Sequence, residues 1–306
     1  MFSHLRELQF TAKPDKPDPL YAMKLQELIG GQFGEMTVTM QYLFQGWNCR
    51  MPGKYKDMIM DIATEEIGHV EMIATMVARL LEGAPCEVTA AAVAADPAVA
   101  AVIGGMNPQH AIVSGGGAMP ANSQGIPWQA GYIVASGNLL TDFRSNAAAE
   151  GQGRLQTSRL YGMSDDPGVR SMLAFNLARD TWHQQQWLLG IEQLQADGLA
   201  EVIEHSNAEA DDPTHDHTFW SMTQGPSDAR EGRWAGGQTL VGGKTIEYLP
   251  EPPHLTDDVG VLPAPDPNLF ATYDGDQGAG TAGDEPTSTT KARAGGIGEK
   301  IKDALT

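Results

Sequence analysis

The chain has 306 residues and a formal net charge of −19 at pH 7, which argues against nucleic acid and anionic membranes as partners because both attract basic surfaces. Its hydrophobic content of 41% supports a sizeable core, yet no apolar run approaches the roughly 20 residues that a membrane-spanning helix needs. The two cysteines, Cys49 and Cys86, are too few for a disulfide framework, and the N-terminus lacks the apolar stretch of a signal peptide, so a cytoplasmic protein is expected.

The N-terminal residues 1–19 are polar and contain three prolines, so they are expected to form an extended arm outside the core. A first helix is predicted to begin at Pro19, because proline is tolerated in the first turn of a helix, and to end before Pro52. Its buried stripe advances in steps of three and four residues and includes Glu35 and Tyr42. Three glycines near Glu35 are poor helix formers and are expected to let another backbone approach closely.

A second helix is predicted from about Lys54 to Glu82, because Gly83 and Pro85 are typical of a helix C-terminus. One of its faces is apolar except for an acid and an imidazole three residues apart. This face consists of Ile59, Ile62, Glu66, His69, Ile73, Val77 and Leu80.

Residues 84–125 are rich in alanine, glycine, valine, serine and proline. They predict a long irregular crossover with one short helix near residues 90–103. A crossover of this length inside a compact domain usually has a function or lies against a partner.

A third helix is predicted from about Pro127 to Gly162, and a fourth from about Pro167 to Ala196. The turn between them, Ser164-Asp165-Asp166-Pro167, has the composition of a helix start. Both helices again have polar residues on an otherwise apolar stripe. The charged or ionisable ones are Glu150 and Arg154 on the third helix and Asp180 and His183 on the fourth, whose stripe also includes Asn176.

Residues 198–273 are dense in proline, glycine, aspartate and aromatic residues, and they are predicted to wrap the bundle or a neighbouring subunit with little regular structure. Short strands at 238–241 and 245–249, joined across two glycines, predict a hairpin in this segment. Residues 274–306 have the composition of a mobile tail. Residues 20–197 are thus the predicted core domain of an all-α protein, a four-helix bundle with a long crossover and an irregular C-terminal extension.

Two acid–His pairs, one in each half of the bundle, have the i, i+3 spacing that puts both side chains on one helix face. They are Glu66 with His69 and Asp180 with His183. Both pairs lie on stripes that should be buried, where an acid or an imidazole without a partner is costly. Ferritin-like bundles that hold two metal ions take one Glu from each of two helices and a Glu-x-x-His from each of the other two. The chain matches this arrangement, with an aspartate in place of one motif glutamate.

The sequence therefore predicts a pair of metal ions inside the bundle. The predicted ligands are Glu35, Glu66, His69, Glu150 and His183. Asp180 has a shorter side chain, and we expect it to hydrogen-bond metal-bound solvent from behind the ligands. Carboxylates with one imidazole per metal suit manganese or iron, and the absence of cysteine from these stripes disfavours zinc and iron–sulfur clusters. A single acid–His pair has ordinary structural explanations, but acids on four helices in the required order favour a metal site.

Four segments that carry these residues together resemble the manganese catalases. They are QFGEMTVTMQYLFQGW (32–47), ATEEIGHVEMI (63–73), NLLTDFRSNAAAEGQGRLQTSRLY (138–161) and DDPGVRSMLAFNLARDTWHQQQW (165–187). The resemblance extends over roughly residues 1–270. It implies a ferritin-like four-helix core, two solvent-bridged manganese ions per subunit and a homohexamer. The implied reaction is the disproportionation of hydrogen peroxide to water and dioxygen, with the metal pair cycling between Mn(II)2 and Mn(III)2.

The resemblance also implies roles for individual residues. It makes the five predicted ligands the manganese ligands, with Glu66 bridging the two ions. Tyr42 would hydrogen-bond a ligand carboxylate, and Asp180 would shuttle protons. Some members of the family have an arginine directly before the third-helix glutamate, where this chain has Ala149. We expect Arg154, one turn further on, to supply the missing positive charge.

Some members of the family also bind calcium between the bundle and the C-terminal segment. Asp57 and Asp61, four residues apart on one helix, offer two hard oxygen ligands. The remaining ligands would fall on Ser221, Thr223 and Gly225, where relatives have Asn, Ser and Gly. A solvated acidic face explains the two aspartates equally well.

Three alternatives stay open at this point. A di-iron carboxylate oxidase or a ferritin-like iron-binding protein would use the same ligands as a manganese enzyme, and only metal analysis would separate them. A metal-free structural protein with a degenerate site is disfavoured by the complete ligand set. A binding module that acts through the C-terminal segment has no specific motif in its support.

Overall fold

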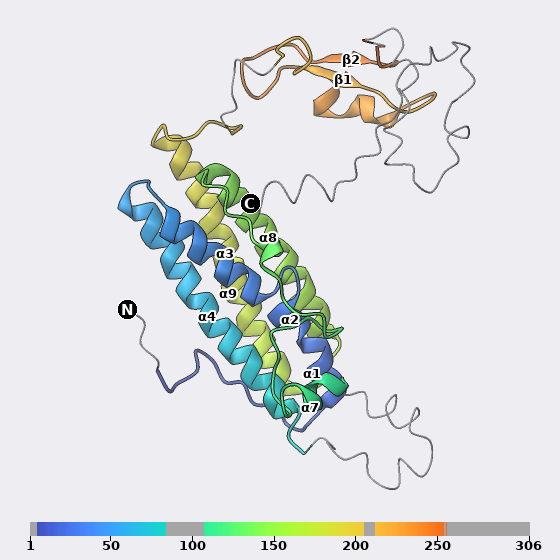
Figure 1. The fold of residues 1–306 in the computed structure, drawn as a ribbon. Coiled ribbons are helices and arrows are strands. Elements are labelled where there is room, and N and C mark those ends of the chain that lie inside the picture. Colours follow the sequence, from blue (N-terminus) through green and yellow to red (C-terminus); the bar gives the residue numbers. More distant parts are fainter. Residues whose placement is uncertain (1–4, 84–106, 205–211, 254, 256–306) are drawn as a thin grey trace, which may run out of the picture. The chain divides into compact units, whose positions relative to one another are not determined.

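The computed structural model describes residues 5–83, 107–204, 212–253 and 255 (Figure 1). The helices are α1 (Pro19–Leu25), α2 (Glu27–Gly30), α3 (Glu35–Asn48), α4 (Gly53–Leu80), α7 (Pro108–Ile112), α8 (Leu139–Gly162) and α9 (Pro167–Ala196), with short 3₁₀ turns at η1 (Ala130–Tyr132), η2 (Asp228–Glu231) and η3 (Arg233–Ala235). The strands are β1 (Thr218–Trp220) and β2 (Glu247–Leu249). The chain divides into two compact units, residues 1–219 with 229–247, and residues 220–228 with 248–306.

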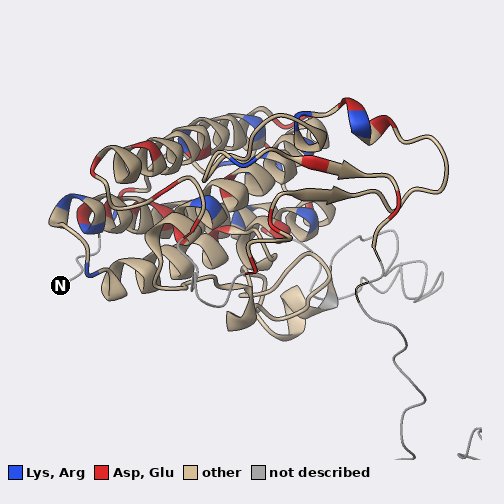
Figure 2. Ribbon diagram, turned by 90° about the horizontal axis from the view of Figure 1, so that it is seen from above, with Lys and Arg blue, Asp and Glu red and all other residues tan. Residues whose placement is uncertain are grey.

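The four long helices α3, α4, α8 and α9 lie side by side and form a bundle (Figure 1). Helix α3 packs on α4 and α8 packs on α9, and contacts of α3 with α8 and of α4 with α9 close the bundle. The predicted all-α four-helix bundle is therefore confirmed. Among the described helices, none is long and apolar enough to cross a bilayer. Figure 2 shows acidic residues spread over the bundle helices with basic residues among them.

The apolar core consists of two clusters, and the polar stripe residues lie between them along the helices. On α4, the apolar residues within 55–63 belong to the first cluster and those within 72–80 belong to the second. On α9 the order is reversed, with residues 169–173 in the second cluster and residues 187–194 in the first. Each helix therefore has its polar residues in the gap, so that an apolar layer on either side separates them from water.

The predicted first helix is wrong in one respect, because it is broken into α1, α2 and α3. One break lies at Gln26, and the second lies at residues 31–34, where Gly31 and Gly34 have extended backbones. A Cβ atom on Gly30 would lie 2.3 Å from the backbone carbon of Ala121, so the expected close approach of another backbone is confirmed there. The second break makes Glu35 the first residue of α3, where the helix dipole favours a negative charge.

The predicted bounds of α4 and α9 are confirmed to within two residues. Asp166 caps α9 as its side chain accepts hydrogen bonds from the backbone N–H groups of Gly168 and Val169. Helix α8 begins at Leu139 and not near Pro127, because Asn138 supplies its N-cap.

The described part of the crossover, residues 107–138, contains α7 and η1 and is otherwise irregular. The helix expected near 90–103 falls outside the described residues. The arm before α1 has no helix or strand between residues 5 and 18, yet Ala12 is fully buried, so the expectation that the arm stays outside the core is wrong. The ring of Phe10 stacks on Phe175 of α9 at 4.5 Å.

In the C-terminal segment, β1 pairs with β2. The predicted hairpin is reduced to an isolated bridge between Gln238 and Thr245, because the second predicted strand pairs instead with β1. The expected tail at 274–306 falls outside the described residues.

Candidate metal centre

The six acids and imidazoles predicted to converge do so in the middle of the bundle. Glu35 comes from α3, Glu66 and His69 from α4, Glu150 from α8, and Asp180 and His183 from α9. All six are buried, with at most 7% of their surface exposed. Helical spacing explains the convergence, since each residue occupies the inward stripe of its own helix at the level where the apolar clusters are interrupted.

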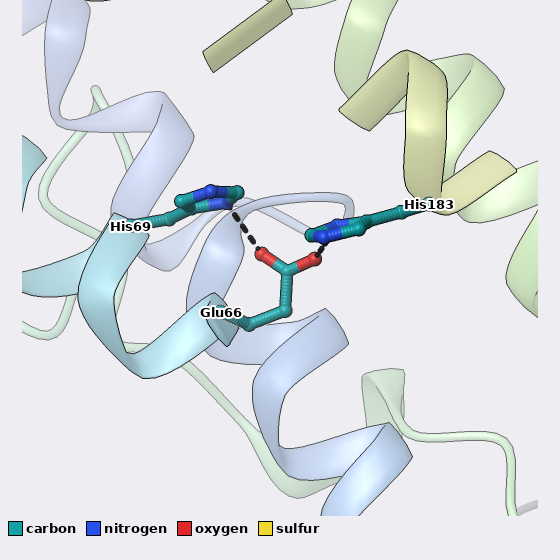
Figure 3. A group of neighbouring side chains, drawn as sticks. All are labelled: Glu66, His69 and His183. Carbon is teal, nitrogen blue, oxygen red and sulfur yellow. Dashed lines mark hydrogen bonds and ion pairs between the residues drawn. The ribbon is translucent and has the colours of Figure 1, made fainter. Parts of the chain in front are cut away.

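Glu66 lies between the two imidazoles (Figure 3). Its Oε2 atom is 2.8 Å from Nδ1 of His69, and its Oε1 atom is 2.6 Å from Nδ1 of His183. The two rings are nearly parallel, with centroids 5.5 Å apart. Each oxygen of this carboxylate thus lies close to one imidazole. A carboxylate that bridges two cations requires this arrangement.

The outer carboxylates repeat this pattern on either side of Glu66. Oε2 of Glu35 lies 3.7 Å from Nδ1 of His69, and Oε1 of Glu150 lies 4.0 Å from Nδ1 of His183. Each half of the centre therefore contains one imidazole, one outer carboxylate and one oxygen of the shared Glu66. These ligand atoms on either side of Glu66 are close enough to hold a metal ion.

Neighbouring side chains hold the outer carboxylates. The Tyr42 hydroxyl donates a hydrogen bond of 2.6 Å to Oε1 of Glu150, so a hydrogen bond from Tyr42 to a predicted ligand is present. The Asn176 amide donates to Oε1 of Glu35 at 3.0 Å and to Oδ2 of Asp180 at 2.8 Å. Asn176 stood on the predicted stripe of α9, but no role was predicted for it.

Without a bound cation, burial and the charges of neighbouring acids raise the pKa values of three carboxyl groups. Burial and then repulsion from Glu66 raise the pKa of Glu35 to about 7. Burial and then the charges of neighbouring acids raise the pKa values of Glu150 and Asp180 well above their usual range. The site is therefore short of positive charge.

The imidazoles partly supply that charge. Burial alone would lower the pKa of His69, but Glu66 and Glu35 outweigh it and raise this pKa well above its usual value. Burial opposes a raised pKa for His183 too, yet contacts with Glu65 and Glu66 raise it to about 10. The same pairs lower the pKa of Glu66 against the effect of its burial. A divalent cation could take over the role of these two protons.

Several buried polar atoms in the cluster have no well-aligned hydrogen bond among the residues that the structure describes, although some of them lie in ion pairs. They are Oε1 of Glu66, Nε2 of His69, Oδ1 of Asn176, Oδ1 of Asp180 and both ring nitrogens of His183. Such atoms are costly unless something binds them. Three groups of ligand atoms lie within 4.8 Å of one another: Glu66–His69–His183, Glu35–His69–Asp180 and Glu150–Asp180–His183. Oxygen donors with one imidazole on each side fit hard divalent ions such as manganese or iron.

Arg154 does not contact a predicted ligand through any described hydrogen bond. Its Nη1 atom donates to Oε1 of Gln184 at 2.7 Å, and Gln184 in turn donates to the backbone oxygen of Ala147 at 3.0 Å. Arg154 thus fixes the side chain of Gln184, which directly follows His183. Its role as a source of positive charge stays a prediction.

Sequence reasoning missed Glu65 and Arg179, which form a bidentate ion pair at the edge of the centre. Nε and Nη2 of Arg179 donate to the two carboxylate oxygens of Glu65 at 2.5 and 3.0 Å. Burial would raise the pKa of Glu65, but contacts with His183 and Arg179 outweigh this effect and lower the pKa below its usual range. The available signal was that each residue directly precedes a motif acid, Glu66 or Asp180, and that the two have opposite charges.

The five residues considered for calcium lie in different compact units. Asp57 and Asp61 are exposed on α4, in the first unit. Ser221, Thr223 and Gly225 belong to the second unit. Calcium binding therefore stays a prediction.

Comparisons with known proteins agree with this geometry. The family model described as manganese containing catalase matches residues 1–279. A manganese catalase of Bacillus subtilis (strain 168) is 53% identical over 265 residues, which cover 87% of this chain and 96% of the relative. A manganese catalase of Lactiplantibacillus plantarum is 43% identical over 263 residues, 83% of this chain and 96% of the relative. The crystal structure of KatB, a manganese catalase from Anabaena, matches with a TM-score of 0.64 and 25% identity, over 82% of this chain and 100% of that chain. The chain therefore belongs to the family of manganese-containing catalases.

Proposed function

We propose that the five predicted ligands hold two manganese ions per chain and that hydrogen peroxide is disproportionated there, two molecules giving two of water and one of dioxygen. The observation that carries this proposal is the position of Glu66, whose carboxylate oxygens lie 2.8 and 2.6 Å from Nδ1 of His69 and of His183. The family membership supports the activity and the choice of manganese. When bound, the manganese pair would supply the two electrons that cleavage of the O–O bond requires and recover them from a second peroxide.

Asp180 is the residue best placed to move protons in this reaction. Asn176 holds its Oδ2 atom, while its Oδ1 atom is buried without a hydrogen bond from any described residue and lies 3.7 Å from Nδ1 of His69. Peroxide cleavage needs a proton delivered to each departing oxygen, and peroxide oxidation releases protons. A carboxyl group with one free oxygen at the centre can do both in turn.

Tyr42→Phe should weaken manganese binding or lower activity by roughly 10–100-fold, the usual effect of removing a hydrogen bond to a metal ligand. The change deletes the donor that orients Glu150 and leaves the ring packing intact. Metal content after dialysis and steady-state oxygen evolution would measure it. Tyr55→Phe is the matched control, because Tyr55 is also buried but donates to Asp197 on α9's C-terminal side. Equal effects of the two changes would contradict the role of Tyr42.

The stability of the metal-free protein should fall as pH rises through the neutral range. A group whose pKa is raised by folding stabilises the fold below its unfolded pKa, and this contribution is lost as pH rises through the folded value. For His183 the window runs from 6.5 to about 10, and His69 acts in the same sense. The lowered pKa of Glu66 matters only below its ordinary value of 4.5.

Bound manganese replaces these protons, so the gap in Tm between loaded and metal-free protein should widen between about pH 6.5 and pH 9. Thermal unfolding with and without manganese, at several pH values and constant ionic strength, would measure the gap. A gap that stays constant with pH would contradict the assignment of His69 and His183.

We further propose a cytoplasmic homohexamer in which bound calcium stabilises subunit contacts. Exposed apolar side chains on the bundle, among them Phe44, Trp47, Leu188 and Leu189, support burial by a neighbouring subunit. Sedimentation before and after calcium chelation would test this. A hexamer is expected before chelation and smaller species after it; a hexamer that survives chelation would argue against the calcium site, and a monomer throughout would argue against the assembly.

A further inference from the structure

Glu65 faces the outer edges of both imidazoles of the metal centre. Glu66 lies against the Nδ1 atoms, whereas Glu65, the preceding residue, lies against the Nε2 atoms. Its Oε2 atom is 3.1 Å from Nε2 of His183, and its Oε1 atom is 3.8 Å from Nε2 of His69. Each ring is therefore placed between two carboxylates.

Two elements of the chain, helix α9 and the N-terminal arm, hold Glu65 in place. Arg179 of α9 binds both of its oxygens, at 2.5 and 3.0 Å. Gln9 of the N-terminal arm donates a hydrogen bond of 2.8 Å to Oε1. Gly68 of α4 makes room for this arm, because a Cβ atom there would lie 2.8 Å from Oε1 of Gln9. Next to Gln9, the ring of Phe10 is stacked on α9.

The chemistry of imidazole makes an acceptor at Nε2 necessary. If Nδ1 donates its lone pair to a metal, the single proton of the neutral ring lies on Nε2. The Nε2 atoms of His69 and His183 are both buried and have no well-aligned hydrogen bond among the described residues. A buried N–H without an acceptor is costly, and the acceptor behind a ligating histidine sets the orientation and basicity of its ring.

We propose that Glu65, held by Arg179 and Gln9, is a positioning residue that accepts the Nε2 protons of both manganese-binding histidines. One carboxylate serves two rings because each of its oxygens faces one of them. The bidentate pair with Arg179 fixes the plane of the carboxylate. The N-terminal arm thereby becomes part of the support of the metal centre.

This inference rests on the proposed manganese ligation, and the test separates the two. Glu65→Gln keeps the size of the side chain and one oxygen acceptor but loses the charge and the second acceptor. It should weaken manganese binding, measured by competition with a chelator, by roughly 10–100-fold. It should also change the electron paramagnetic resonance spectrum of the Mn(II)-loaded protein. Arg179→Gln should act in the same direction, and Glu65→Asp should recover part of the affinity.

Controls come from exposed residues of the same bundle. Glu192→Gln on α9 and Arg159→Gln on α8 remove the same charges away from the centre and should leave manganese affinity and spectrum unchanged. If Glu65→Gln lowers only the Tm of the metal-free protein and leaves affinity and spectrum as in wild type, Glu65 is a structural tie between helices and the inference is overturned. A wild-type protein that binds no manganese would overturn the proposed function instead.

Gln9→Ala provides a second variant, because Gln9 is exposed and its loss should not prevent folding. It should weaken manganese binding several-fold, less than Glu65→Gln, since Arg179 still holds the carboxylate. Unchanged affinity and an unchanged spectrum in this variant would remove the arm from the support of the centre.

Discussion

Glu66→Gln is expected to lower kcat/KM for hydrogen peroxide by about 10³-fold or more, because losing one charge-stabilising donor at an active site already costs about 10²–10³-fold. An amide retains the shape of the side chain but has no negative charge to share between two cations. It also directs an N–H group at the Nδ1 atom of His69 or of His183, where the carboxylate now has an oxygen at 2.8 and 2.6 Å.

The metal content of this variant should fall together with its activity. Oxygen evolution and manganese content, measured on the same preparation, would show whether both are lost. Glu82→Gln, at an exposed position just beyond α4, is the matched control and should behave as wild type. A Glu66→Gln protein that keeps its manganese and its activity would rule out a bridging role for this carboxylate.

His183→Ala is expected to reduce bound manganese from two ions per chain to at most one and to bring oxygen evolution to background. The imidazole is the sole nitrogen donor of its half of the centre among the described residues. In the metal-free protein the same change removes a cationic partner from Glu66, and breaking a buried ion pair of this kind costs about 3–5 kcal/mol of unfolding free energy.

Urea unfolding of the metal-free protein and metal analysis of the loaded protein would measure both effects. His217→Ala is a suitable control, because His217 lies outside the bundle and pairs with Asp216 at 2.9 Å. Retention of both ions in His183→Ala would contradict the ligand assignment.

The sequence was sufficient where local signals and burial agree. Helix α9 has a capping aspartate and α4 ends shortly before Gly83, and the polar residues on their buried stripes stand out from an apolar background. Asp166 before α9 is an example, since an aspartate followed by proline marks a helix start without reference to the rest of the fold. The position of the six buried acids and imidazoles follows from helix periodicity alone.

The errors arose where tertiary contacts decide the local structure. Just before the break between α2 and α3, the backbone of Ala121 closely approaches Gly30, more than ninety residues away in sequence. The segment before α8 stays non-helical since Val134 exchanges hydrogen bonds with Gln41 and Gln45 of α3. Neither contact can be read from the local sequence.

Residues that support the centre from outside were the hardest to predict. Periodicity identifies side chains on the inward stripe, and Glu65 is not on it. Its importance depends on Arg179, 114 residues away in sequence, and on an arm that the composition suggested was outside the core. Asn176 was on the stripe, but only the structure shows that it joins Glu35 to Asp180.

Metal analysis combined with an activity assay can show whether two manganese ions at Glu66 carry out peroxide disproportionation. Manganese and iron should be quantified in protein from manganese-replete cells, alongside azide-sensitive oxygen evolution, for wild type and His183→Ala. We expect about two manganese ions per wild-type chain and one dioxygen per two peroxides consumed, with both lost in the variant. A wild-type protein that contains mostly iron, or no metal, and releases no dioxygen from peroxide would contradict it.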